Sequence, residues 1–294
     1  MTGLTSILLP TDFSSGSRAM ARYTALLARR FEAKITIVNV VSPPNLAEVY
    51  ALGGFELFLR DLREDQRALA QKQLESFAVE DLNGCNVKRV LMDGPDPAVS
   101  ILGVADSELC DLIMMATRGR GVFRRLILGS VTAKVLHDVH RPVWTGVHVE
   151  QMLPPSKTDF GTILCAVDTN SDNLDAMRWA VGIASEYRAQ VVLVHAIPSL
   201  QPNALTSDFE AELRGFLVGQ AKERLSNIAH DCGLDDPDMY IEGGSVYSVV
   251  RVAAEIRKAD LVVIGRPARA GLIGRLRSNT YAIIRDAPCP VVSV

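Results

Sequence analysis

No apolar run in the sequence approaches the roughly 20 residues that a membrane-spanning helix needs, and the opening MTGLTSILLPTDFS lacks the regions of a signal peptide. The five cysteines are scattered, odd in number and form no CxxC pair, which indicates neither a disulfide framework nor a zinc site. With 31 basic and 34 acidic residues, the net charge of −3 leaves no basic excess for binding nucleic acid. We therefore expect a cytoplasmic protein with reduced thiols that binds neither membrane nor nucleic acid.

Strong catalytic signatures are missing as well. The sequence has no GxxxxGK[ST] run and no GxGxxG after its first predicted strand. His137 and His140 lie one helical turn apart without a third ligand nearby, so we predict no metal site. Without a placed general base, or a lysine on a transferring phosphoryl group, we predict no catalytic residue and no fast hydrolysis. Slow turnover by a backbone cradle and Mg²⁺ alone stays open.

What the sequence does contain is a duplication. The chain of 294 residues is 48% hydrophobic and long enough for two domains, and four segments recur in the same order. These are residues 7–12 and 163–168, 33–40 and 189–196, 110–115 and 259–264, and 130–143 and 278–291. A period this long indicates duplicated domains. The turn-forming stretch at 153–157 predicts a linker, so we expect domains at residues 1–149 and 161–294.

Each copy reads as alternating strands and helices. Short apolar runs without polar alternation predict strands buried on both faces, in the first copy at 6–10, 34–40, 87–92, 112–116 and 143–147. Amphipathic stretches predict helices between them, at 15–31, 59–81, 97–109 and 130–138, and in the second copy at 174–187, 209–232, 246–258 and 279–286. This alternation predicts two similar, doubly wound α/β domains.

Three features of the first copy are expected to meet at one edge of its sheet. Asp12 ends the first strand, the run Ala116–Gly121 follows the fourth, and Gly129–Thr132 opens the last helix. If the strand order reverses between these two strands, their carboxyl ends border the crevice where such folds bind ligands. Glycine can adopt positive φ and lets backbone approach a ligand, and a helix N-terminus favours anions. Arginines supply further cations for phosphate, at 118, 120, 124 and 125. The alternative interpretations are a solvated surface loop and an aspartate that only caps a helix.

On these residues the sequence resembles the universal stress protein family, twice and over nearly the whole chain. ATP-binding members carry Gly, two residues, Gly, nine residues, Gly, then Ser or Thr. Here Ala116, Gly119, Gly129 and Ser130 keep that spacing, with alanine in place of the first glycine, and residues 9–14 resemble the family's first strand with its adenosine-contacting aspartate.

The resemblance implies a five-stranded parallel sheet with helices on both faces, of the adenine-nucleotide α-hydrolase-like kind. It also implies bound ATP, ADP or AMP, with or without Mg²⁺. Pro10, Thr11, Asp12 and Val40 would line the adenosine side, and Met115 and Ala116 would lie near the ribose. The phosphates would be cradled by Arg118, Gly119, Gly129, Ser130, Val131 and Thr132. If position 116 needs positive φ, its Cβ would weaken binding about tenfold.

The second copy departs from the pattern. Asp168 survives at the strand end, but Pro267 and Ala268 interrupt the loop and the late glycine is gone, so we expect no tight triphosphate site there. The leading hypothesis is a stress-response module that binds an adenine nucleotide in its first domain and presents a surface to an unidentified protein partner. The alternatives are a slow ATPase or nucleotidyl-transfer enzyme on the same fold, and a nucleotide-free interaction scaffold. The resemblance also implies an internal pseudo-dimer through the final strands, and a homodimer is a further hypothesis.

Overall fold

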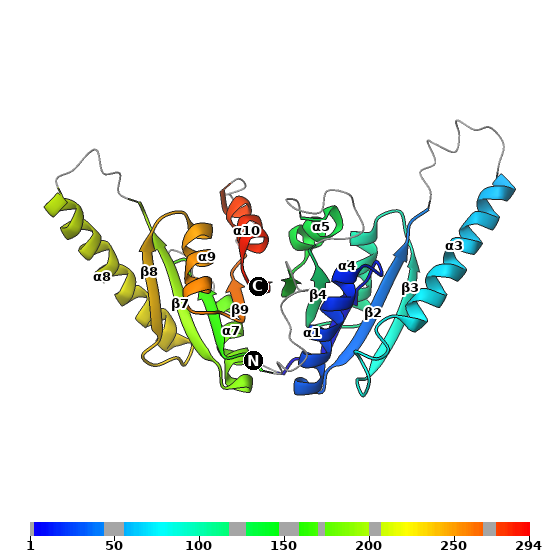
Figure 1. Ribbon diagram of the computed structural model, residues 1–294, viewed down its shortest axis with the longest axis horizontal. Helices are drawn as coiled ribbons and strands as arrows, with labels where there is room; N and C mark the ends of the chain where they lie inside the picture. The colour runs from blue at the N-terminus through cyan, green and yellow to red at the C-terminus, as the bar shows by residue number, and fades with distance from the viewer. Residues whose placement is uncertain are drawn as a thin grey trace. The chain divides into compact units, whose positions relative to one another are not determined.

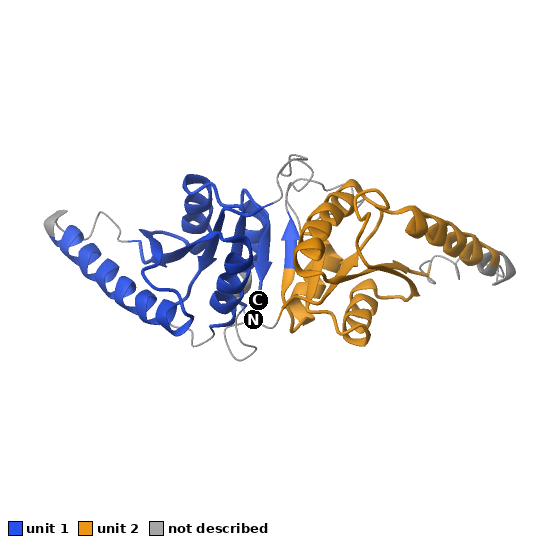
Figure 2. Ribbon diagram, turned by 90° about the horizontal axis from the view of Figure 1, so that it is seen from below, with its two compact units in different colours: residues 1, 144–294 blue, residues 2–143 orange. Residues whose placement is uncertain are grey.

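The computed structural model of the protein describes residues 3–43, 56–117, 128–146, 159–169, 174–199, 207–266 and 275–294. The chain divides into two compact units, residues 2–143 in one and residues 144–294 with residue 1 in the other (Figure 2). We call the elements β1 to β5 the first repeat and the elements β6 to β10 the second repeat. No helix within the described ranges is long and apolar enough to cross a membrane.

The first repeat alternates strands and helices along the chain (Figure 1). Its elements are β1 (Ser6–Pro10), α1 (Ser15–Phe31), β2 (Lys34–Val41), α3 (Glu56–Ser76), β3 (Val87–Asp93), α4 (Pro97–Ser107), β4 (Leu112–Ala116), α5 (Ser130–Asp138) and β5 (Val143–Gly146). The strands lie in the order β3-β2-β1-β4-β5, and the pairs of β1 with β2 and with β4 are parallel. The chain thus winds outward from β1 and then returns to β1's other side.

The second repeat follows the same plan. Its elements are β6 (Thr162–Ala166), α7 (Asp175–Tyr187), β7 (Gln190–Ile197), α8 (Ser207–Asp231), β8 (Asp238–Gly243), α9 (Val246–Ile256), β9 (Leu261–Ile264), α10 (Arg275–Asp286) and β10 (Val291–Ser293). Their order is β8-β7-β6-β9-β10, again with parallel pairs. Two doubly wound, five-stranded α/β repeats are therefore present, as the sequence predicts.

Helices cover both faces of the sheet in the first repeat (Figure 1). The helix α1 packs on β1, β2 and β4, and Arg22 in α1 forms an ion pair with Asp81 just beyond α3, so these two helices share a face. The helices α4 and α5 pack together, and Lys134 of α5 pairs with Asp96 at the start of α4. Burial drives this arrangement, because the side chains of α1 that face the sheet are almost fully buried, including Met20 and Leu27.

Within each repeat, an aspartate before the fourth strand accepts hydrogen bonds from amides at or just before the start of the first strand. In the first repeat, the carboxylate of Asp111 accepts bonds from the amides of Thr5 and Ser6, at 2.8 and 2.9 Å. In the second, Asp260 accepts from the amides of Gly161 and Thr162, at 2.7 and 3.2 Å. The duplication seen in the sequence therefore extends to individual contacts.

Two expectations about elements are wrong in detail. The outermost strands β3 and β8 are half-exposed along most of their length, because a strand at the rim of a sheet has only one neighbour. The helix α3 ends at Ser76, whereas the apolar pattern predicts that it continues to Asp81. The pattern persists because Phe77 and Leu82 are buried, but the backbone turns at Ala78, whose φ is +51°.

Candidate functional site at the carboxyl edge of the first sheet

The predicted reversal of strand order lies between β1 and β4. These two strands are parallel neighbours, with Ile7 opposite Leu112 and Leu8 opposite Ile113. Asp12 follows the carboxyl end of β1, and Ala116 is the last residue of β4. The chain ends of both strands therefore reach the same edge of the sheet, at the point where doubly wound folds bind ligands.

Asp12 is half-buried and held at one oxygen. Its Oδ1 accepts hydrogen bonds from the amide and the hydroxyl of Ser14, at 3.1 and 2.6 Å, and from the hydroxyl of Ser17, at 2.9 Å. No described residue donates to Oδ2. The N-cap of α1 is Ser14, whose side chain accepts from the amide of Ser17. Asp12 therefore braces the start of α1 through Oδ1, as the capping interpretation predicts, and its Oδ2 receives no bond from a described residue.

The start of α5 is tied to the end of β4. The amide of Gly129 donates to the carbonyl of Thr117 at 2.9 Å, and the hydroxyl of Thr132 donates to the carbonyl of Ala116 at 3.0 Å. These two bonds hold the start of α5 against the end of β4. Thr132 is buried and its hydroxyl is used in the bond to Ala116, so only its amide remains for a ligand. The ion pair of Lys134 with Asp96 fixes the same helix from its other side, and it lowers the pKa of the Asp96 carboxyl and raises that of Lys134.

The first turn of α5 is not capped by a side chain. Its N-cap is Gly129, and within the described ranges nothing accepts a hydrogen bond from the amides of Ser130, Val131 or Thr132. The helices α1 and α4 differ, since Ser14 and Asp96 accept bonds from their first-turn amides. Open amides at a helix N-terminus, aided by the helix dipole, form a binding site for an anion such as phosphate.

Backbone conformation at the two key positions differs from expectation. The φ of Gly129 is −56°, so this glycine does not use the left-handed conformation open to it. Ala116 ends β4 in extended backbone and is not among the residues with positive φ, so its Cβ adds no strain there. The expected weakening by an alanine at this position therefore lacks its structural cause.

The remaining predicted residues are placed as follows. Pro10 and Met115 are buried at the ends of β1 and β4, and Thr11 is buried just beyond β1. Val40 is half-buried near the end of β2, where a Cβ added to Gly94 would lie 3.8 Å from its Cγ1. Arg118 and Gly119, with the other loop arginines, lie outside the described residues.

The sequence interpretation missed Asn39. This buried side chain donates from Nδ2 to the carbonyl of Thr11 at 2.8 Å and fixes the turn that carries Asp12. Its signal was a single polar residue within the otherwise apolar end of β2. In the second repeat, His195 takes the equivalent place, and its Nδ1 lies 2.8 Å from the carbonyl of Val167. Because a carbonyl only accepts, Nδ1 carries the proton.

Each repeat is therefore a doubly wound α/β domain of the class that binds ligands at the carboxyl edge of its sheet. Residues 3–145 and 159–294 each match the model of the Universal stress protein family, and the chain belongs to this family. The family and the fold predicted from the sequence are thereby confirmed.

Relatives support this assignment at the level of the whole chain and of one repeat. A universal stress protein of Mycolicibacterium smegmatis is 22% identical over 292 residues, covering 98% of this chain and 96% of the relative. The universal stress protein MJ0531 of Methanocaldococcus jannaschii is 33% identical over 138 residues, covering 47% of this chain and 78% of the relative. The crystal structure of a universal stress protein from Archaeoglobus fulgidus has a TM-score of 0.69 at 21% identity, covering 98% of this chain and 97% of that one.

Proposed function

We propose that the first repeat binds an adenine nucleotide, ATP or its products ADP and AMP, in a cytoplasmic stress-response module. The proposal depends on one observation: two sets of polar atoms without a described hydrogen-bond partner lie at the same edge of the sheet. These groups are the uncapped amides of α5, which suit phosphate, and the free Oδ2 of Asp12, which suits a donor on the nucleoside. The loop motif that spans Ala116 to Ser130 supports the same assignment.

The proposed roles follow from the placement of the groups. The amides of Ser130, Val131 and Thr132 would receive phosphate oxygens, at no cost in broken protein hydrogen bonds. Asp12 would accept a hydrogen bond from the nucleoside, next to Val40 at the end of β2. Mg²⁺, when present, supplies charge neutralisation on the phosphates. The chain's own residues bind and orient the nucleotide, and a change in occupancy would alter the surface that a protein partner reads.

The second repeat is proposed to serve as a scaffold, because Val167 and the divergent loop replace parts of the first site. Pairing of the repeats through their final strands, a homodimer and the identity of a protein partner stay predictions from the sequence.

Equilibrium dialysis with ATP tests the proposal. We expect about one bound nucleotide per chain. Asp12→Ala should weaken binding ten- to a hundredfold, since a hydrogen bond to a charged group contributes about 1.5–3 kcal/mol. The matched control is Asp168→Ala, which removes the equivalent strand-end aspartate of the second repeat and should leave the affinity unchanged.

Two results would contradict the proposal. The first is the absence of binding at millimolar ATP by the unmodified chain. The second is an equal loss of affinity in both aspartate variants, which would place the nucleotide elsewhere. Turnover of bound ATP, followed in the same samples, would separate a slow ATPase from a binding module.

A further inference from the structure

Two buried hydroxyl groups connect the end of β1 to the carboxylate of Asp12. The hydroxyl of Thr11 accepts a bond from the amide of Phe13 at 3.0 Å and donates to the hydroxyl of Ser17 at 3.2 Å. The hydroxyl of Ser17 donates to Oδ1 of Asp12 at 2.9 Å. The same hydroxyl also lies 3.1 Å from the carbonyl of Ser14, so Oδ1 of Asp12 is the nearer of two acceptors for its single proton. We call Thr11 and Ser17 the hydroxyl relay.

The relay is shielded from water. Thr11 is 7% exposed and Ser17 is 2% exposed. In such surroundings hydrogen bonds strengthen, and bonds in series polarise one another. The acceptor at the end is a carboxylate, which makes the last bond a charge-assisted one. The relay therefore fixes the orientation of Asp12 more firmly than a solvated side chain could.

The geometry at Asp12 shows what this orientation leaves open. Ser14 and Ser17 together saturate Oδ1, while no described residue donates to Oδ2. The following residue, Phe13, has a φ of +62°, a strained conformation for a bulky side chain. Strain of this kind persists only where surrounding contacts enforce it. The bond from the amide of Phe13 to Thr11 is one of these contacts, so the relay holds the turn as well as the carboxylate.

The second repeat provides an internal comparison. Val167 takes the place of Thr11 and has no hydroxyl, although Asp168 is retained. Ser15 opens α1 three residues after Asp12, whereas Asp175 opens α7 seven residues after Asp168, without a side-chain cap. The second repeat therefore folds without a hydroxyl at the position of Thr11, which indicates that the fold does not require this hydroxyl.

We propose that Thr11 and Ser17 are positioning residues that hold Oδ1 of Asp12, so that Oδ2 is presented to a hydrogen-bond donor on the nucleoside of a bound nucleotide. This proposal rests on the proposed function of the first repeat. The relay residues do not themselves contact the nucleotide.

Paired substitutions at Thr11 test the relay. Thr11→Val copies the second repeat, keeps the shape of the side chain and removes the hydroxyl, and it should weaken ATP binding about tenfold. Thr11→Ser keeps the hydroxyl and should retain most of the affinity. Ser17→Ala should weaken binding by a factor similar to Thr11→Val. Because the effect acts on the nucleoside side, adenosine should lose affinity by the same factor as ATP.

The control is Thr24→Val in the same helix. Thr24 is fully buried and its hydroxyl donates to the carbonyl of Met20, away from the site. It should lower stability while leaving ATP affinity unchanged, so it separates positioning from general loosening. Unfolding curves for all variants show whether each is folded under the binding conditions, and the Thr11 pair decides the question if Ser17→Ala does not fold.

The outcomes separate this proposal from the proposed function. If the unmodified chain binds ATP but Thr11→Val and Ser17→Ala bind equally well, the positioning role is overturned and the function stands. An equal loss in Thr24→Val, or a failure of Thr11→Ser to retain affinity, also overturns the positioning role. If the unmodified chain binds no ATP, both proposals are overturned.

Discussion

At the scale of the residue, Gly129 occupies a position where the backbone itself does not require a glycine. Its φ of −56° suits any residue, and an added Cβ would lie 3.4 Å from the carbonyl oxygen of Thr117 and 3.8 Å from Oγ1 of Thr132. Both distances are ordinary contacts. A small side chain therefore fits the protein, and under the proposed function the glycine gives phosphate room for a close approach to the α5 amides.

Gly129→Ala is expected to leave the free energy of unfolding within about 1 kcal/mol of the unmodified protein. ATP affinity should fall, and Gly129→Leu should lower it more than tenfold because the larger side chain covers the amides. Calorimetric titration measures the affinities, and urea unfolding measures the stabilities. The control is Gly103→Ala in α4, where an added Cβ meets no atom within 4 Å. An unchanged affinity in Gly129→Leu would refute a phosphate at this helix start.

The sequence predicted that Asp12 follows a strand end and that Gly129 opens a helix, and the structure agrees, because strand ends and helix starts leave local signals. It did not reveal that Asn39 fixes the turn before Asp12. That contact joins residues 28 positions apart, at 2.8 Å. Only the parallel register of β1 and β2 brings them together, with Leu9 opposite Ile37 and Pro10 opposite Val38. Side-chain bonds across strands have no fixed spacing in the sequence.

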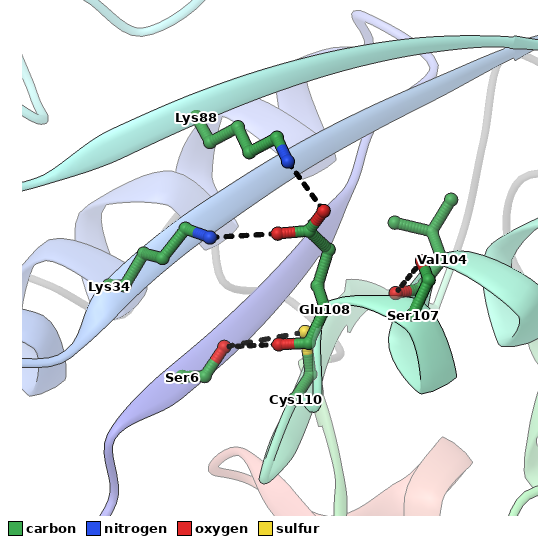
Figure 3. Close-up of polar contacts among 7 residues, drawn as sticks. All are labelled: Ser6, Lys34, Lys88, Val104, Ser107, Glu108 and Cys110. Atoms are coloured by element: carbon green, nitrogen blue, oxygen red, sulfur yellow. Dashed lines mark hydrogen bonds and ion pairs between the residues drawn. The ribbon is translucent and has the colours of Figure 1, made fainter.

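At the scale of the elements, a carboxylate joins two strands to the turn between α4 and β4. Glu108 contacts the ammonium groups of Lys34 in β2, at 2.7 Å, and Lys88 in β3, at 2.6 Å (Figure 3). The hydroxyl of Ser6 in β1 approaches the backbone of the same turn. These contacts lie at the amino edge of the sheet, opposite the edge that carries the candidate site. The hydrogen bond with Lys34, followed by that with Lys88, lowers the pKa of the Glu108 carboxyl from its ordinary value.

Glu108→Gln should reduce the dependence of stability on acid. A carboxyl whose pKa is lower in the folded than in the unfolded chain contributes stability above its unfolded pKa and loses it as the pH falls through its folded pKa. The difference in unfolding free energy between the unmodified protein and Glu108→Gln should therefore be largest above the usual glutamate pKa of about 4.3 and shrink as the pH falls below it. Urea unfolding at several pH values measures it. A difference that stays constant over this range would show that the carboxylate charge plays no part.

Element boundaries show the same division between local and distant causes. The spacing of apolar residues predicts β1, α1, β4 and α5 with their observed limits, because caps and strand ends are encoded nearby. The end of α3 depends instead on Arg89 in β3, which donates to the carbonyls of Leu74 and Phe77 at 2.9 and 3.2 Å. These bonds satisfy carbonyl groups at the helix end. No pattern within α3 itself indicates them.

At the scale of the whole molecule, the two repeats keep the same framework and differ at their sites. Asp111 and Asp260 make equivalent bonds, and Asn39 and His195 hold equivalent turns. The Thr11 hydroxyl of the relay has no counterpart in the second repeat, since Val167 takes its place. The two repeats thus share these contacts and the strand-end aspartate, while the residue at position 11 and the loop after the fourth strand differ from their counterparts in the second repeat.

Hydrogen exchange followed by mass spectrometry tests whether this asymmetry determines where nucleotide binds. Binding stabilises the folded state by about 2.7 kcal/mol when free ligand exceeds the Kd a hundredfold. Amides that exchange through local opening near the ligand gain protection, whereas amides in a repeat without ligand do not. We therefore expect ATP to slow exchange at the start of α1 and in the first turn of α5. Exchange in β6 and α7 should be unchanged.

Asp12→Ala supplies the control for this experiment, because it should abolish the protection in the first repeat at the same ATP concentration. Equal protection of β6 and α7 would show that the second repeat also binds nucleotide without a hydroxyl at the position of Thr11. The site would then depend on features that both repeats share, such as the strand-end aspartates Asp12 and Asp168. Protection confined to α1 and α5 would instead show that the groups lost from the second repeat are those that binding requires.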